Sequence, residues 1–137
     1  MSDVLAAGLA AAVVSGAPST TWALVRGGDP LEAARAAGAM VVGERAGAAA
    51  QLAAAVPVHL ALSLGWTWML ARIRPARGGA GWGAAAGLAI AALDLGVAGR
   101  RIAPIERLPL APQVADHVAF GAVVAGVLAH RASSSSV

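Results

Sequence analysis

The chain has 137 residues, of which 58% are hydrophobic and only 12% are charged. An average soluble domain carries about 25% charged residues, so this chain has about half the charge needed to cover a water-facing surface. The composition therefore excludes an ordinary soluble globular domain and a disordered chain. Because one membrane crossing takes about 20 apolar residues, the length allows at most about five transmembrane helices and little chain outside them.

The remaining composition excludes further classes of function. The chain has no cysteine, so disulfides, thiolate metal sites and a thiol nucleophile are excluded. Its ten basic residues are all arginines, spread beside the apolar runs. That distribution is typical of membrane-interface anchors and not of a nucleic-acid-binding patch. We expect membrane lipids and other membrane proteins, but no nucleic acid, as partners.

Four long stretches hold no charge or a single acid, and each is flanked by charged residues. They predict transmembrane helices at residues 4–25, 46–71, 79–99 and 110–130, because a helix satisfies all of its backbone polar groups within lipid. The sequence therefore predicts an all-α polytopic membrane protein. Residues 1–131 form its single domain, and the Ser-rich tail 132–137 is expected to be disordered.

A polar run, Ser15-Gly16-Ala17-Pro18-Ser19-Thr20, interrupts the first stretch. A cleaved signal peptide is the alternative interpretation, but no basic segment precedes the apolar run and Pro18 is badly placed for cleavage. We expect a kink in the helix, because proline frees backbone carbonyls to which neighbouring hydroxyls can bond.

The connections between the four helices differ in character. Asp29, Pro30 and Glu32 form the pattern of a helix start, which predicts a short interfacial helix at residues 30–42 that acts as a connector or as a lid. Arginines dominate the turn at residues 72–77, and Trp66, Trp68 and Trp82 near it suggest an aromatic belt. The proline-rich loop at residues 100–112 is expected to be mostly nonhelical. The arginines at the two faces do not fix the orientation in the membrane.

The informative residues are the ionisable ones inside the apolar stretches: His59, Asp94, Asp116 and His117. Such groups are costly in hydrocarbon, so they usually face the bundle or a functional pathway. At 1.5 Å per helical residue, all four fall about 20 Å from the arginine-rich turn and share one layer of the membrane. Asp116 and His117 are adjacent on a helix, about 100° apart, and therefore face different neighbours.

Three interpretations of this layer remain open. A carboxylate that accepts a hydrogen bond from a histidine on another helix would hold the bundle together. A chain of carboxylates and imidazoles could instead relay protons or ions. His59 and His117 could also ligate a b-type haem, which makes a haem anchor the third alternative.

Small residues recur at helical spacing on the last two helices, at Gly79, Gly83, Gly87 and Gly121. Such faces let helix backbones approach closely, and they predict helix packing within the chain or against a partner. Recognisable enzyme motifs, phosphate-binding loops and metal-ligand spacings are missing from the sequence, so we expect a noncatalytic protein with no cofactor or bound metal.

In its segments SGAPST, DPLEAARAAG, ALDLG and PQVADHVAFG, the sequence resembles small four-helix integral membrane proteins of actinobacterial type, a group with no established activity. The resemblance implies a multi-pass protein of the bacterial plasma (inner) membrane. The function expected first is that of a noncatalytic accessory or structural subunit of a larger membrane complex, either a transporter or a respiratory assembly. The alternative is a small homo-oligomeric proton-coupled transporter or channel that uses the Asp/His layer.

Overall fold

The part of the chain that the structure describes consists of helices joined by short turns. The computed structural model describes residues 2–134 and has no strand among them. Four of its segments are long and apolar enough to cross a membrane: Ser2–Arg26, Ala48–Ile73, Ala80–Arg101 and Leu110–Ser134. The expected all-α membrane fold with four crossings is therefore confirmed.

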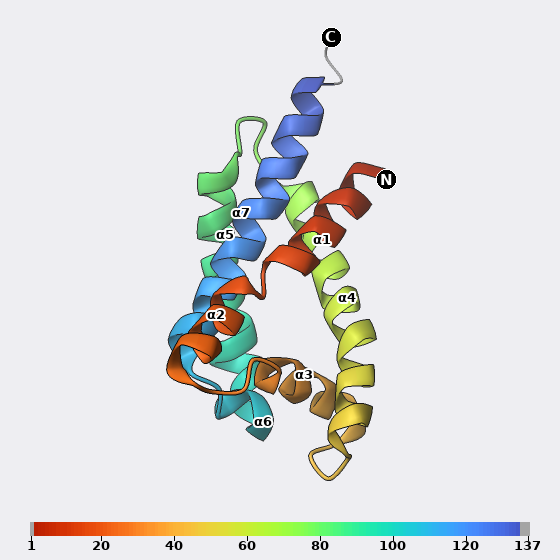
Figure 1. Ribbon diagram of the computed structural model, residues 1–137. Helices are drawn as coiled ribbons and strands as arrows, with labels where there is room; N and C mark the ends of the chain where they lie inside the picture. The colour runs from red at the N-terminus through yellow and green to blue at the C-terminus, as the bar shows by residue number, and fades with distance from the viewer. Residues whose placement is uncertain (1, 135–137) are drawn as a thin grey trace.

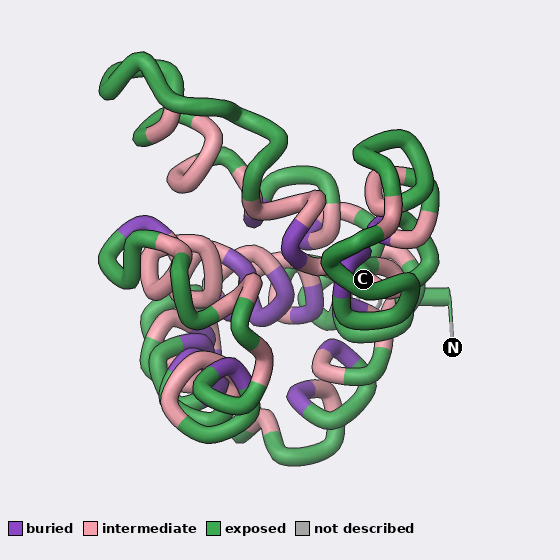
Figure 2. Tube along the Cα trace, turned by 90° about the horizontal axis from the view of Figure 1, so that it is seen from below, coloured by how far each residue is buried: buried purple, intermediate pink, exposed green. Residues whose placement is uncertain are grey.

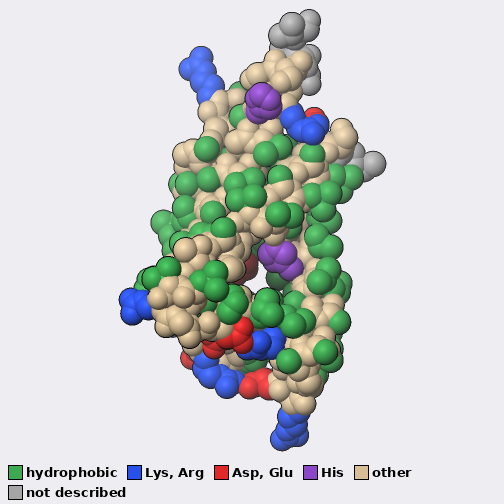
Figure 3. Space-filling view, in the orientation of Figure 1, with side chains coloured by type: hydrophobic (Ala, Val, Ile, Leu, Met, Phe, Trp, Pro, Cys, Tyr) green, Lys and Arg blue, Asp and Glu red, His purple; other side chains and the backbone are tan. Residues whose placement is uncertain are grey.

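The crossings are assembled from shorter elements, in the order α1 Ser2–Val14, α2 Ala17–Arg26, α3 Glu32–Val42, α4 Ala48–Ile73, α5 Ala80–Leu93, the π-helix η1 Asp94–Ala98, the 3₁₀-helix η2 Gly99–Arg101, α6 Ala103–Glu106 and α7 Leu110–Ser134. The first crossing consists of α1 and α2, and the third consists of α5, η1 and η2. The start of α1 and the end of α7 lie at one end of the bundle, and α3 and α6 lie at the other (Figure 1). Charged side chains gather at these two ends, with an apolar band between them (Figure 3).

Glycines determine how closely the backbones of α5 and α7 approach each other. A Cβ atom on Gly83 would lie 2.1 Å from the carbonyl oxygen of Gly121, and one on Gly87 would lie 2.1 Å from that of His117. Neither site has room for a methyl group, so the two backbones touch, as small residues allow in membrane helices. Gly79 was expected on this face, but a Cβ there would meet nothing within 4 Å. It precedes the first turn of α5 and takes no part in the contact.

The main core lies toward the end of the bundle at which α1 begins. Its buried residues come from α1, α4, α5 and α7 and are Ala7, Ala11, Leu70, Ile90, Phe120, Val124 and Leu128. Buried stretches of the helices face one another across the middle of the bundle (Figure 2). Near the same end, Arg131 of α7 lies 2.9 Å from Asp3 of α1 and forms an ion pair with it.

Toward the other end, α4 diverges from α7, and α3 lies across the opening (Figure 1). α3 packs closely on the first turn of α4, since a Cβ atom on Gly38 would lie 1.7 Å from the carbonyl oxygen of Gln51. The predicted start of this helix at Pro30 is wrong, because α3 begins at Glu32 with Leu31 as its N-cap. Oδ1 of Asp29 accepts a hydrogen bond of 2.8 Å from the backbone N–H of Leu31 and so holds the turn that precedes the helix. That bond and the side chain of Arg35 lower the pKa of Asp29, so this carboxyl stays charged at pH values below the range in which an aspartate usually takes up its proton.

Two expectations about the loops and the tail are wrong. The segment at residues 100–112 is mostly helical, because it holds the end of η2, all of α6 and the start of α7. Its prolines are tolerated there since Pro104 and Pro112 both fall in first turns, where no intrahelical N–H donor is needed. Residues 132–134, which were expected in the tail, belong to α7, which continues to Ser134. The expected disorder at residues 135–137 lies outside the described residues.

The glycine contact predicts a sharp difference between two substitutions in α5. Gly83→Ala places a methyl group against the backbone of α7, which cannot give way as a side chain could. We expect it to lower the free energy of unfolding by about 1–3 kcal/mol, the usual cost of overpacking. Gly81→Ala, two residues away with nothing within 4 Å, should be neutral or slightly stabilising. Thermal unfolding of both variants in detergent measures the difference, and equal stability would show that α5 and α7 are not in backbone contact.

Candidate functional site

The first crossing is broken at the level of the predicted polar layer. α1 ends at Val14 and α2 begins at Ala17, as the expected kink required. In an unbroken helix the carbonyl of Val14 would accept from residue 18, but Pro18 has no N–H. The break therefore leaves backbone donors and acceptors that must be satisfied inside the membrane.

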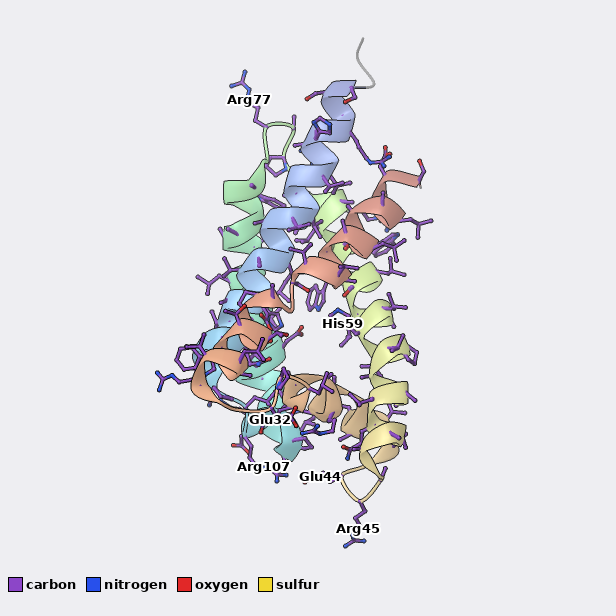
Figure 4. The ribbon with its side chains drawn as sticks, in the orientation of Figure 1. Glu32, Glu44, Arg45, His59, Arg77 and Arg107 are labelled. Carbon is purple, nitrogen blue, oxygen red and sulfur yellow. The ribbon has the colours of Figure 1, made fainter. Side chains whose placement is uncertain are left out.

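Two of the predicted layer residues satisfy these groups from other helices. Nε2 of His59, on α4, donates a hydrogen bond of 2.8 Å to the carbonyl oxygen of Ala12, near the end of α1. Oδ1 of Asp116, on α7, accepts one of 2.9 Å from the backbone N–H of Ser19, in the first turn of α2. An anionic side chain at a helix N-terminus also interacts favourably with the helix dipole. His59 points from α4 toward the break (Figure 4).

The other two layer residues face each other. Nε2 of His117, on α7, lies 3.5 Å from Oδ2 of Asp94, the first residue of η1. The same Asp94 oxygen accepts a hydrogen bond of 3.0 Å from the indole Nε1 of Trp66, on α4. Asp94 therefore joins the second, third and fourth crossings. As the sequence predicted, the adjacent residues Asp116 and His117 face different neighbours.

The two ring nitrogens of His117 have different partners. Nδ1 of His117 lies 2.8 Å from the carbonyl oxygen of Gln113, and a carbonyl can only accept, so Nδ1 carries a hydrogen. In a neutral imidazole Nε2 is then an acceptor, and it faces a carboxylate oxygen, which is also an acceptor. At 3.5 Å the contact is longer than an ordinary hydrogen bond, so it is a close approach between two groups that can each carry a proton.

All four layer residues line a single cavity of about 660 Å³ between α2, α3, α4, η1 and α7. Most of its wall is apolar, with alanines of α3 on one side and Phe120 of α7 on another. The hydroxyls of Ser15, Ser19 and Ser63 add polar groups to the wall. Figure 3 shows a hollow on this face of the molecule, with a histidine at its edge. A few polar groups in an otherwise apolar concave wall are typical of small-molecule sites.

Three crossings have a break, an internal proline or a change of helix type near this cavity. α1 and α2 are separated by the break, Pro57 lies inside α4, and the π-helix η1 begins at Asp94. Irregular backbone inside a membrane is tolerated where it is buried in protein or lines a cavity. π-Helical turns are also frequent at functional sites. Most of the backbone irregularity within the crossings is thus concentrated near one layer.

Several members of the site were not predicted. Trp66 was assigned to the aromatic belt, but its indole bonds Asp94 inside the bundle, so that assignment is wrong. Trp68 is instead exposed on the surface of the bundle, where the guanidinium of Arg72 is 3.5 Å from the centroid of its ring. Helical spacing could have separated the two tryptophans, because they are two positions apart and so face different directions.

The haem alternative finds little support in the geometry. Both ring nitrogens of His117 and Nε2 of His59 already contact protein atoms. Among residues 2–134, no group of three or more His, Cys, Asp or Glu side chains is arranged to hold a metal ion.

No family model matches the chain, and comparisons with curated proteins and with solved structures find no match either.

The contact between Asp116 and Ser19 predicts a test of what holds the broken helix. Asp116→Asn keeps an oxygen that can accept from the N–H of Ser19, whereas Asp116→Leu, of similar size, does not. We expect the leucine variant to be less stable than the asparagine variant by about 1–3 kcal/mol, the cost of a buried unsatisfied donor. Thermal unfolding in detergent compares them, and a leucine variant as stable as the asparagine variant would contradict the capping role.

Proposed function

We propose that the chain is a small proton-coupled membrane carrier, whose solute occupies the cavity between α2, α3, α4 and α7. The observation that carries the proposal is that all four ionisable residues of the membrane layer line this one cavity. Ionisable groups are expensive in the membrane, and a role in bundle packing alone does not require them to share a hollow space.

The geometry of these groups supports a role in proton transfer. Nε2 of His117 and Oδ2 of Asp94 lie 3.5 Å apart, so a small movement brings them within proton-transfer distance, and both residues border the cavity. Their side chains are 22% and 30% exposed, so a proton or a solute in the cavity can reach them. Carboxylate and imidazole groups serve this purpose in proton-coupled transport.

The broken crossing supports the same proposal. Membrane carriers commonly bind their solutes near the bilayer midplane, at helices that are interrupted there. In this chain the interruption between α1 and α2 borders the cavity through Ser15, Gly16 and Ser19. A solute that competes for the groups freed by the break can then alter the packing of the helices around it.

Proton flux into liposomes tests the proposal. We expect the interior of liposomes that contain the protein to acidify when the imposed membrane potential is negative inside. A pH-sensitive dye enclosed in the liposomes reports this change. Asp94→Asn should lower this flux at least tenfold, because its side chain can no longer exchange a proton with His117. Glu106→Gln is the matched control, since it makes the same chemical change in α6, outside the cavity wall.

Three outcomes of the flux experiment would count against the proposal. A wild-type flux no greater than that of protein-free liposomes would contradict the proposal. So would an Asp94→Asn variant that is folded, by circular dichroism and elution volume, and conducts as the wild type does. Loss of flux in the Glu106→Gln control would point to a general effect of charge and would equally count against a specific role of Asp94.

The accessory-subunit hypothesis makes a different prediction. It relied on small-residue helix faces, but Gly83, Gly87 and Gly121 are buried between α5 and α7, so a partner would have to dock elsewhere. Affinity purification from native membranes in mild detergent distinguishes the two proposals. A carrier should be recovered alone or as a homo-oligomer, whereas stoichiometric recovery with one larger membrane complex would favour the accessory role. Both proposals are noncatalytic and keep the expected location in a bacterial plasma membrane.

A further inference from the structure

The cavity wall contains acidic side chains but no side chain with a permanent positive charge. Its wall contains the carboxylates of Asp94 and Asp116 and, among the described residues, no arginine; the chain has no lysine. His117, 3.5 Å from Asp94, adds a positive charge only when it is protonated. His59 needs only its neutral form to donate to Ala12, so it supplies no obligatory positive charge to balance Asp116.

An unbalanced carboxylate in an apolar wall is costly unless a proton or another cation approaches it. Asp116 has one oxygen on the backbone N–H of Ser19, and Oδ2 of Asp94 is taken by Trp66 and His117. Within residues 2–134, no hydrogen bond to Oδ1 of Asp94 is found. The cavity therefore combines negative charge with a carboxylate oxygen that has room for a further partner.

The size and the lining of the cavity narrow the choice of cation. A volume of about 660 Å³ is far larger than a bare metal ion and falls within the range of sites for drug-sized molecules. Most of the wall is apolar and includes the aromatic side chains of Trp66 and Phe120, which attract cations as well as apolar groups. An anion would meet two carboxylates and no arginine, and is disfavoured.

We propose that the solute of this cavity is an organic cation with an apolar body, whose charge lies near Asp94 and Asp116. This inference rests on the proposed carrier function and names its substrate class. The titratable groups that face the cavity are Asp94 from η1, Asp116 and His117 from α7 and His59 from α4. The other wall elements contribute no ionisable side chain within the described residues, so cation and proton compete for the two carboxylates.

Binding of two probes of equal shape and opposite charge tests the inference. Tetraphenylphosphonium and tetraphenylborate have nearly the same apolar surface, so a difference between them reports charge. Equilibrium dialysis of the full chain in a nonionic detergent, corrected for uptake by empty micelles, should show saturable binding of the phosphonium only. Asp94→Asn combined with Asp116→Asn should weaken this binding at least tenfold, while Glu106→Gln should leave it unchanged. Lower pH should weaken binding in the wild type, because protonated carboxyls no longer attract the cation.

The outcomes separate this inference from the carrier proposal. Equal binding of both probes, or binding that the double variant retains, would overturn the inference. Proton flux that depends on Asp94, without any phosphonium binding, would leave the carrier function standing and reject the organic cation. Phosphonium binding that depends on the carboxylates, in a protein that conducts no protons, would support the site and reject the carrier. If the double variant fails to fold, the single variants and the pH dependence of wild-type binding give the same decision.

Discussion

The break between α1 and α2 is the constraint on which the polar layer depends. Lipid offers no hydrogen-bond partners, so a helix interrupted in the membrane must find donors and acceptors on its neighbours. His59 supplies the donor for the end of α1 and Asp116 the acceptor for the start of α2. These two bonds come from α4 and α7, so the interruption ties three crossings together. For His59 and Asp116, a polar side chain that is costly in an intact bundle thus meets a structural need of the broken helix.

The close contact of α5 and α7 places the other half of this layer. Because Gly83 and Gly121 let the two backbones touch, the helices remain in register down to His117 and Asp94. At Asp94 the third crossing changes to the wider π-helix η1. The widening begins at the residue that faces His117 and Trp66, so the backbone change and the polar contact lie at one level. α4 has no such close packing on α5 or α7, and the space on that side remains open as the cavity.

The sequence predicts the parts of this arrangement that depend on distance along a helix. The spacing of charged residues gave the four crossings, and the depth of four ionisable residues gave one layer. It also gave the divergence of Asp116 from His117. The sequence does not predict how each helix is rotated about its own axis. Apolar residues surround nearly every face of a membrane helix, so no periodic pattern marks the face that points into the bundle. Trp66 was therefore assigned to the interface, and the cavity and the π-helix were not foreseen.

The two ends of the cavity differ in how firmly they are closed. Toward the chain termini, the buried cluster around Leu70 and Val124 would have to separate, at the cost of exposing apolar contacts within the bundle. At the other end, α3 covers the opening, and an ion pair between Glu44 and Arg107 links the α3–α4 connection to the segment after α6. Both side chains are about half exposed or more, and such pairs contribute only about 0–1 kcal/mol.

α3 is joined to α4 by the contact of Gly38 with Gln51, so the two helices would move as one unit. Pro57, inside α4 and close to His59 in the chain, gives that unit a point at which to bend. The end covered by α3 is accordingly the one whose opening requires the least rearrangement of the bundle.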